Sequence, residues 1–166
     1  AARVIAFLDQ MARSIEGAVA TVGTIRFEPN AINVIPSVAI FTVDLRNPNE
    51  ERLKGQEKAL ASFLVELKKE GFAVENEELA RFEPVTFNPT IVATIEACTA
   101  ERQLSFRRMT SGAGHDAQMI ARVAPSAMIF VPSKDGISHN PTEFTSDADL
   151  IAGANVLLDV VRKLSQ

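Results

Sequence analysis

Apolar and polar positions follow two different rhythms in the first half of the chain. In residues 2–16 the apolar side chains recur every three to four positions, which predicts an amphipathic helix ended by Gly17. Residues 18–28 and 38–46 are rich in β-branched and aromatic side chains and predict two strands, antiparallel to each other. The connection between them, residues 29–37, is punctuated by two prolines.

A second helix and a third strand complete this half. Residues 47–71 open with Asn-Pro-Asn and carry an apolar stripe among charged positions, which predicts a long surface helix. Residues 72–83 predict a third strand. The order helix, strand, strand, helix, strand lacks one leading strand of the split βαβ sandwich. We therefore expect an α+β fold over residues 1–83, with a partial ferredoxin-like domain.

Helices and strands alternate in the second half, and the prediction places a domain boundary near residues 83–87. In chain order it predicts a helix over 88–104 with Asn88 as its N-cap, a short strand over 105–110, a Gly-rich turn and helix over 111–125, a buried strand over 126–132 and a helix over 147–164. The alternation predicts that residues 84–166 form part of a parallel α/β sheet.

Composition narrows the classes of partner. The chain is 46% hydrophobic and 23% charged, so it can build a core. Its net charge is −4, whereas proteins that bind nucleic acid or acidic membranes present a basic surface. The lone Cys98 lies in an apolar helical pattern and predicts a buried structural thiol. Neither a spanning apolar run nor a signal peptide is present, and we expect a cytoplasmic protein. The start inside a helix, without Met or cap, suggests a piece of a longer protein.

Both histidines of the chain follow an expected strand of the second half. His115 lies in "SGAGHDA" and His139 in "GISHNPTE", and ligands of open α/β sheets bind at the carboxyl ends of strands. Neither has a dense metal-ligand spacing, so most ligands of any metal must come from elsewhere. The Gly-rich turn over residues 111–114 lacks the Lys-Ser/Thr pair that completes a P-loop. Its backbone N–H groups can hold a carboxylate or carbonyl oxygen, while a plain strand-to-helix turn is the alternative.

Two residues of the first half are candidates for binding an anion. Asn33 lies on the connection between the two prolines, and Arg46 ends a predicted strand. An arginine can hold a carboxylate by two parallel hydrogen bonds, although a solvated strand-end charge is the alternative. We expect Arg107 and Arg108 to include one member of a structural ion pair.

Three segments carry a resemblance to a known family. "PNAINVIPS…FTVDLR", "RRMTSGAGHDAQMIA" and "MIFVPSKDGISHNPTE" together resemble the amidase, hydantoinase and carbamoylase branch of the M20 metallopeptidases, along the whole chain. That branch includes N-carbamoyl-L-amino-acid hydrolases, allantoate amidohydrolases and beta-ureidopropionases. The resemblance implies a zinc-peptidase-like α/β catalytic domain with two divalent metals, zinc or manganese, and an inserted ferredoxin-like lid that forms a homodimer. This chain would be most of the lid followed by the C-terminal part of the catalytic domain.

The resemblance also implies roles for individual residues. His139 matches the family's C-terminal metal ligand, Asn33 and Arg46 match lid residues that bind the substrate carboxylate, and the backbone of Gly114 matches a substrate contact. His115 belongs to the same motif, with either a structural role close to the ligands or a direct contact. The implied partners are a small ureido acid and a second copy of the chain, with no nucleic acid and no membrane.

The sequence departs from the family pattern in one respect. The family's other metal ligands, its catalytic Glu and its lid histidine have no counterpart in these residues. A single ligand does not hold a metal tightly, so we expect this chain alone to be inactive. The parent protein is expected to hydrolyse the carbamoyl or ureido C–N bond of N-carbamoyl-L-amino acids or allantoate-type substrates. The alternatives are a non-catalytic dimerising module and a peptidase or deacylase of another M20 branch, and the sequence does not choose among the ureido acids.

Overall fold

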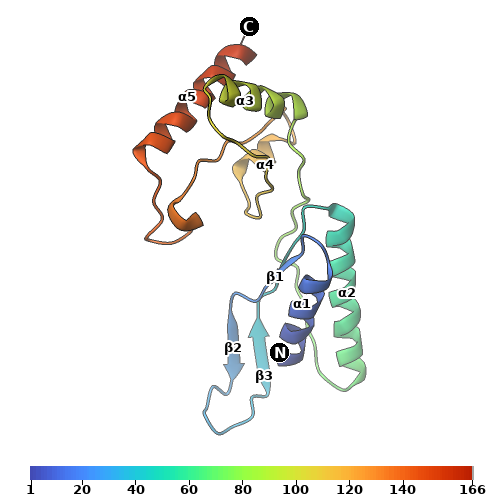
Figure 1. The fold of residues 1–166 in the computed structure, drawn as a ribbon. Coiled ribbons are helices and arrows are strands. Elements are labelled where there is room, and N and C mark those ends of the chain that lie inside the picture. Colours follow the sequence, from blue (N-terminus) through green and yellow to red (C-terminus); the bar gives the residue numbers. More distant parts are fainter. Residues whose placement is uncertain (166) are drawn as a thin grey trace. The chain divides into compact units, whose positions relative to one another are not determined.

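The computed structural model describes residues 1–165 and divides the chain into two compact units, Ala1–Pro84 and Val85–Gln166 (Figure 1). The first unit contains α1 (Ala2–Ser14), β1 (Val19–Thr21), β2 (Ile25–Glu28), β3 (Val38–Phe41), β4 (Asp44–Arg46) and α2 (Glu50–Lys69). The second unit contains α3 (Pro89–Glu101), α4 (Asp116–Ile120), the 3-10 turn η1 (Lys134–Gly136) and α5 (Asp147–Leu164). None of the helices in residues 1–165 combines the length and apolarity that a bilayer-spanning helix needs.

The long helices predicted from the sequence are confirmed, and three of them begin at a capping side chain. The Asn49 side chain accepts a hydrogen bond from the Arg52 backbone at the start of α2. Asn88 caps α3 as predicted, with Pro89 in its first turn, and Ser146 caps α5. Each cap satisfies backbone N–H groups that have no partner inside the helix, which fixes where the helix starts.

The two predicted strands of the first unit pair antiparallel, but each is interrupted. β1 pairs with β4 and β2 pairs with β3, and between these pairs three residues, 22–24, oppose two, 42–43. The Thr42 N–H donates to the Thr24 carbonyl (3.2 Å), and the Thr24 N–H donates to the Thr42 hydroxyl (3.2 Å). One extra residue shifts the register, as in a β-bulge, so the ribbon continues as two short ladders.

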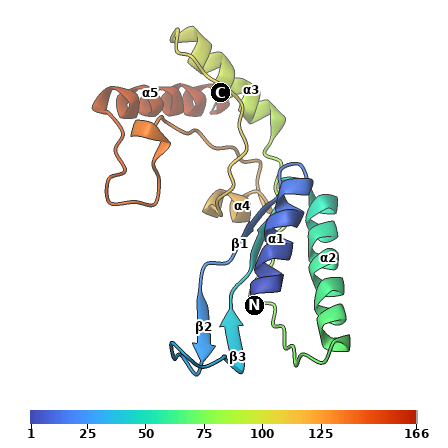
Figure 2. The same ribbon diagram turned by 60° about the horizontal axis from the view of Figure 1, so that its bottom comes forward.

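The core of the first unit lies between its helices and one face of the β1–β4 ladder. Val4, Leu8 and Met11 of α1 are buried together with Leu67 of α2. Figures 1 and 2 show these two helices side by side. Strand alternation turns Leu45 toward this cluster, which leaves its neighbours on β4 on the opposite face.

The core of the second unit lies between α3 and α5. Cys98 is fully buried, as predicted, against Val156 and Val160. Gly153 of α5 is needed for this packing, because a Cβ there would collide with the side chain of Val131. The apolar run before the His139 loop therefore lies directly on α5.

Three strand predictions are wrong. Residues 72–83, 105–110 and 126–132 form no strand in the described part of the chain, and the second unit shows no parallel sheet there. A strand needs a neighbour to satisfy its backbone groups, and none of these segments pairs with another described segment. Residues 72–83 are instead attached to α2 by Arg81, which binds Glu57 (2.9 Å) and Glu50 (2.8 Å).

Candidate functional site

Arg46 is held by a carboxylate of its own strand. Its Nε donates to Asp44 Oδ1 (2.8 Å) and its Nη2 donates to Asp44 Oδ2 (2.7 Å), a bidentate pair on the outer face of β4. The side chains of Arg46 and Asp44 are 49% and 47% exposed. Their hydrogen bonds lower the pKa of Asp44 and raise that of Arg46. The Nε–Nη2 edge of the guanidinium, which suits a ligand carboxylate, therefore already binds one.

Asn33 lies on an exposed loop, residues 29–37, between β2 and β3. Ser37 closes the base of this loop, because its N–H and its hydroxyl both donate to the Glu28 carbonyl (2.9 and 3.1 Å). The apolar side chains of Ile32 and Ile35 are 108% and 93% exposed. The loop thus presents its side chains, including Asn33, to its surroundings.

The structure does not bring Asn33 and Arg46 together. The loop with Asn33 joins β2 to the start of β3, whereas Arg46 ends β4 at the far end of the same ribbon (Figure 1). An extended chain from Val38 to Arg46 spans about 26 Å, at about 3.3 Å per residue. One copy of this unit therefore does not place both side chains on one small carboxylate.

The Gly-rich turn of the second unit is tied to His115. The hydroxyl of Ser111 lies 2.6 Å from His115 Nε2 and accepts a hydrogen bond from the Ala113 N–H (3.2 Å). The backbone N–H of His115 donates to Gln118 Oε1 (3.0 Å). The imidazole also packs edge-to-face on Phe130, with ring centroids 5.6 Å apart. His115 therefore connects the turn both to α4 and to the apolar run that follows it.

Gly114 is not required by the local backbone. Its φ does not lie in the left-handed region, and a Cβ there would make only an ordinary contact, 3.9 Å from Gln118 Oε1. A glycine that the fold does not need leaves room for a ligand to approach the backbone closely. The substrate contact that the resemblance implies for the Gly114 backbone stays a prediction.

His139 is held in an uncommon backbone conformation. Its φ is 55°, in the left-handed region that costs a non-glycine residue roughly 1–2 kcal/mol. Its N–H donates to Glu143 Oε2 (2.8 Å), and Asn140 Oδ1 accepts from the N–H and the hydroxyl of Thr142 (3.0 and 2.8 Å). Residues held in such conformations by surrounding bonds cluster at functional sites.

The described residues do not form a metal centre by themselves. Residues 1–165 contain no group of three or more His, Cys, Asp or Glu placed to hold a metal ion. A zinc ion in proteins takes three or four side-chain ligands, so His139 would contribute to a zinc site completed by other residues. Residues 1–165 by themselves therefore do not supply a full set of metal ligands, and no reaction step through a metal follows from them.

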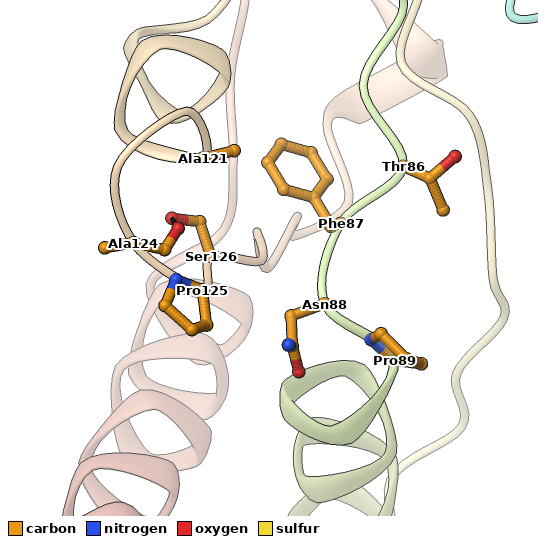
Figure 3. A pocket seen from close by; sticks show the side chains of 8 residues that line it. All are labelled: Thr86, Phe87, Asn88, Pro89, Ala121, Ala124, Pro125 and Ser126. Atoms are coloured by element: carbon orange, nitrogen blue, oxygen red, sulfur yellow. Dashed lines mark hydrogen bonds between the residues drawn. The ribbon is translucent and has the colours of Figure 1, made fainter.

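A pocket of about 300 Å³ in the second unit lies beside the start of α3 (Figure 3). It is lined by Thr86, Phe87, Asn88, Pro89, Ala121, Ala124, Pro125 and Ser126. All of these side chains are neutral, and the amide of Asn88 already caps α3. No predicted site residue lines this pocket, so it is separate from the candidate site.

Four residues of the site were not singled out from the sequence: Asp44, Ser111, Gln118 and Glu143. Each lies two to four residues from a predicted site residue. Strand alternation could have found Asp44, because residues two apart on a strand share a face. The partners made in loops depend on loop geometry. The ion-pair prediction is confirmed for Arg108, which binds Glu96 with two bonds of 2.7 Å.

Comparison with known proteins places these motifs in a family. The chain is 35% identical over 167 residues to an N-carbamoyl-L-amino-acid amidohydrolase of Rhizobium meliloti, covering 99% of this chain and 40% of that protein. It is 38% identical over 147 residues to an allantoate amidohydrolase of Bacillus subtilis, covering 87% of this chain and 35% of that protein. The chain thus spans about two fifths of the curated relatives it matches.

The fold agrees with these relatives. A crystal structure of an amidase of the hydantoinase/carbamoylase family from Burkholderia vietnamiensis superposes with a TM-score of 0.88 at 37% identity, over 96% of this chain and 39% of that one. The sequence pattern of Peptidase family M20/M25/M40 matches residues 5–163. The chain therefore belongs to peptidase family M20/M25/M40.

Proposed function

We propose that this chain is part of an amidohydrolase that cleaves the carbamoyl or ureido C–N bond of a small ureido acid. N-carbamoyl-L-amino acids and allantoate-type compounds are the substrate classes. The observation that carries the proposal is the match of nearly the whole chain to relatives with these two activities. Both substrate classes have a carboxylate, which calls for a cationic binding residue beside the reacting group.

The first unit is proposed to be a ferredoxin-like lid that also forms a homodimer. Its helix order and antiparallel ribbon support this assignment. Arg46 would bind the substrate carboxylate through its planar fork. A substrate using the Nε–Nη2 edge has to displace Asp44, so binding exchanges one charge-assisted pair for another. For Asn33 to reach the same carboxylate, loop 29–37 would have to come from a second copy.

The second unit is proposed to be the C-terminal segment of the catalytic domain. His139 would be one ligand of a divalent metal, zinc or manganese, and the Gly114 backbone would contact the substrate. A metal completed by ligands outside this chain would supply Lewis-acid chemistry at the scissile group. Of the chain's own residues, Arg46 would bind the carboxylate in the first unit, and the loop around His139 would hold the metal ligand in place in the second.

The test is ammonia release by a full-length family member that contains this chain. Wild-type protein is assayed on N-carbamoyl-L-amino acids, allantoate and 3-ureidopropionate, with dipeptides and N-acetyl amino acids as controls. We expect ureido acids to be hydrolysed and the control substrates to be left intact, while the isolated chain is inactive on all of them. Hydrolysis of dipeptides alone would assign another branch of the family. No hydrolysis of any substrate by the metal-loaded full-length protein would favour a non-catalytic dimerising module.

A further inference from the structure

We propose that one side of α5 binds the part of the catalytic domain that lies outside this chain. This free side of α5 consists of six large apolar residues: Leu150, Ile151, Leu157, Leu158, Val161 and Leu164. The inference deepens the proposed function, because it rests on the second unit being a segment of a larger domain. It does not depend on which bond that domain hydrolyses.

Apolar side chains lie on more than one side of α5. Val156 and Val160 are one turn apart on the side that is buried in the core of the second unit. Leu150, Leu157 and Val161 recur at intervals of seven and four, so they form a second line along the helix. All six residues of the free side are 46–61% exposed. A helix that is apolar on most of its sides is typical of the core of a larger protein.

The buried side of α5 is covered by α3, which Figures 1 and 2 show beside it. The two buried valines pack on Cys98 of α3, and Arg102 Nε donates to Asp159 Oδ2 (2.6 Å). The contact with α3 therefore takes up both an apolar and a charged part of α5. The free side stays exposed in spite of this packing, and an exposed apolar patch of this kind marks a surface for a further partner.

The apolar run next to α5 also lacks a neighbour. Residues 126–132 lie on α5, where the side chain of Val131 approaches Gly153, and Ile129 packs into the core. Phe130, between these two residues, is 49% exposed. The run pairs with no other segment of residues 1–165. A sheet that continued beside this run would also offer a face to α5, since helices cover the faces of such sheets.

The length of the relatives indicates what covers the free side. The chain spans about two fifths of the curated relatives it matches, so the larger part of such a protein is available to pack on α5. No charged residue belongs to the free side, which calls for an apolar protein surface as its partner. A membrane fits less well, because α5 begins with Asp147 and Asp149, whereas membrane-surface helices carry Lys and Arg on their polar face.

The first test compares one thiol in two contexts, the isolated chain and a full-length protein that contains it. Leu157→Cys places the thiol on the free side, and Arg162→Cys on the same helix is the matched control. The native Cys98 is fully buried, and peptide mapping by mass spectrometry separates its signal from the others. We expect a maleimide to label both introduced thiols rapidly in the isolated chain. In the full-length protein, Leu157→Cys should react at least about a hundredfold more slowly than Arg162→Cys, at a rate that does not change on dilution.

Equal labelling of the two positions in the full-length protein would overturn the proposal. So would slow labelling of Leu157→Cys in the isolated chain that becomes faster on dilution, because a second copy would then cover the free side. Protection of the full-length protein by added anionic lipid vesicles alone would assign the free side to a membrane instead. If Leu157→Cys does not fold, Val161→Cys on the same line takes its place.

The second test measures thermal stability in the same two contexts. Leu157→Asp should lower the Tm of the full-length protein by about 5 °C or more, since it would bury a charge without a partner. In the isolated chain Leu157 is 54% exposed, and the same substitution should change the Tm by less than about 2 °C. Equal shifts in the two proteins would contradict the interface. A full-length protein that is inactive on every ureido acid would instead refute the proposed function and leave both results standing.

Discussion

The loop of residues 29–37 and the loop of residues 133–145 use similar residues in different ways. Both contain Asn and Pro, and each carries one predicted site residue, Asn33 or His139. The first loop is closed at its base by Ser37 and exposes its apolar side chains. The second is bonded internally, by Glu143 to the backbone of His139 and by Asn140 to that of Thr142.

The two loops can therefore contribute to a site in different ways. A loop whose polar side chains bond its own backbone holds its ligand residue in place before anything binds, which lowers the entropy cost of binding. A loop that is fixed only at its ends leaves its central residues free to adapt to whatever they meet. We therefore expect residues 133–145 to set the geometry of the reaction, and residues 29–37 to supply an adaptable contact.

Replacing His139 should have the largest effect. His139→Ala in the full-length enzyme removes a proposed metal ligand. Removing merely a partner of a ligand typically costs 10–100-fold, so we expect ureido-acid hydrolysis to fall by more than about a hundredfold. Metal content by mass spectrometry of the purified variant should fall in parallel. Full activity and full metal content in His139→Ala would show that the fixed loop is structural.

Replacing Glu143 tests the bond that fixes the loop. Glu143→Ala removes the acceptor of the His139 N–H, and a hydrogen bond to a charged group is worth about 1.5–3 kcal/mol. We expect a ten- to hundredfold loss of kcat/KM, by displacement of His139. Glu143→Gln keeps an acceptor oxygen and is the matched control, with most activity retained. Equal losses in the two variants would mean that the charge of Glu143 matters, and not its hold on the backbone.

A smaller effect concerns pH. The pKa of Asp44 is lowered from its usual value near 3.8 by the hydrogen bonds from Arg46. A carboxyl whose pKa is lower in the folded state than in the unfolded state stabilises the fold at pH values above its unfolded-state pKa. This stabilisation is lost as the pH falls through the folded-state pKa. The pair is about half exposed, so Asp44→Asn should cost less than about 1 kcal/mol at neutral pH and little at pH 2.

Chemical denaturation at several pH values between 2 and 7 measures this difference. In an Arg46→Gln background, Asp44→Asn should have no such pH-dependent effect. A cost that is as large at pH 2 as at pH 7 would show that Asp44 acts through something other than its ionised carboxylate.

The smallest effect is expected in the open loop. Ile35 is 93% exposed, so Ile35→Ser removes almost no buried apolar surface. The free energy of unfolding should therefore change by less than about 0.5 kcal/mol. Leu8→Ala, in the core of the same unit, is the comparison and should cost about 2–5 kcal/mol. A clear destabilisation by Ile35→Ser in a monodisperse sample would show that the loop is packed, against the contrast drawn between the two loops.

The helices could be predicted from the sequence, because apolar periodicity and caps are local signals. Asn88 with Pro89 marks a start that the structure confirms, and α5 begins at Asp147, as predicted. Three predicted strands, residues 72–83, 105–110 and 126–132, are absent from the structure, because a strand needs a pairing partner and a sequence does not show whether one is present. The extra residue between β1 and β2 escaped for the same reason: it is extra only relative to the facing strand.

The site could be predicted as far as its residue types, but not as far as its contacts. Short motifs pointed to Arg46, His115 and His139. The backbone conformation of His139 and the pairing of Arg46 with Asp44 are set by neighbours whose direction a sequence does not give. Only the structure shows whether the side chain of a candidate site residue is already hydrogen-bonded to another residue of the same chain.

The most direct test of the account is Arg46→Lys in the full-length enzyme, assayed on a ureido acid and on its amide analogue. Lysine keeps the charge but lacks the planar fork, so loss of the paired hydrogen bonds should cost roughly 1.5–3 kcal/mol, or about ten- to a hundredfold in kcat/KM, on the acid. The amide lacks the carboxylate, and on it the wild type and the variant should be equally slow. Wild-type activity of Arg46→Lys on the acid, or an equal loss on both substrates, would contradict the assignment of Arg46 as the residue that binds the substrate carboxylate.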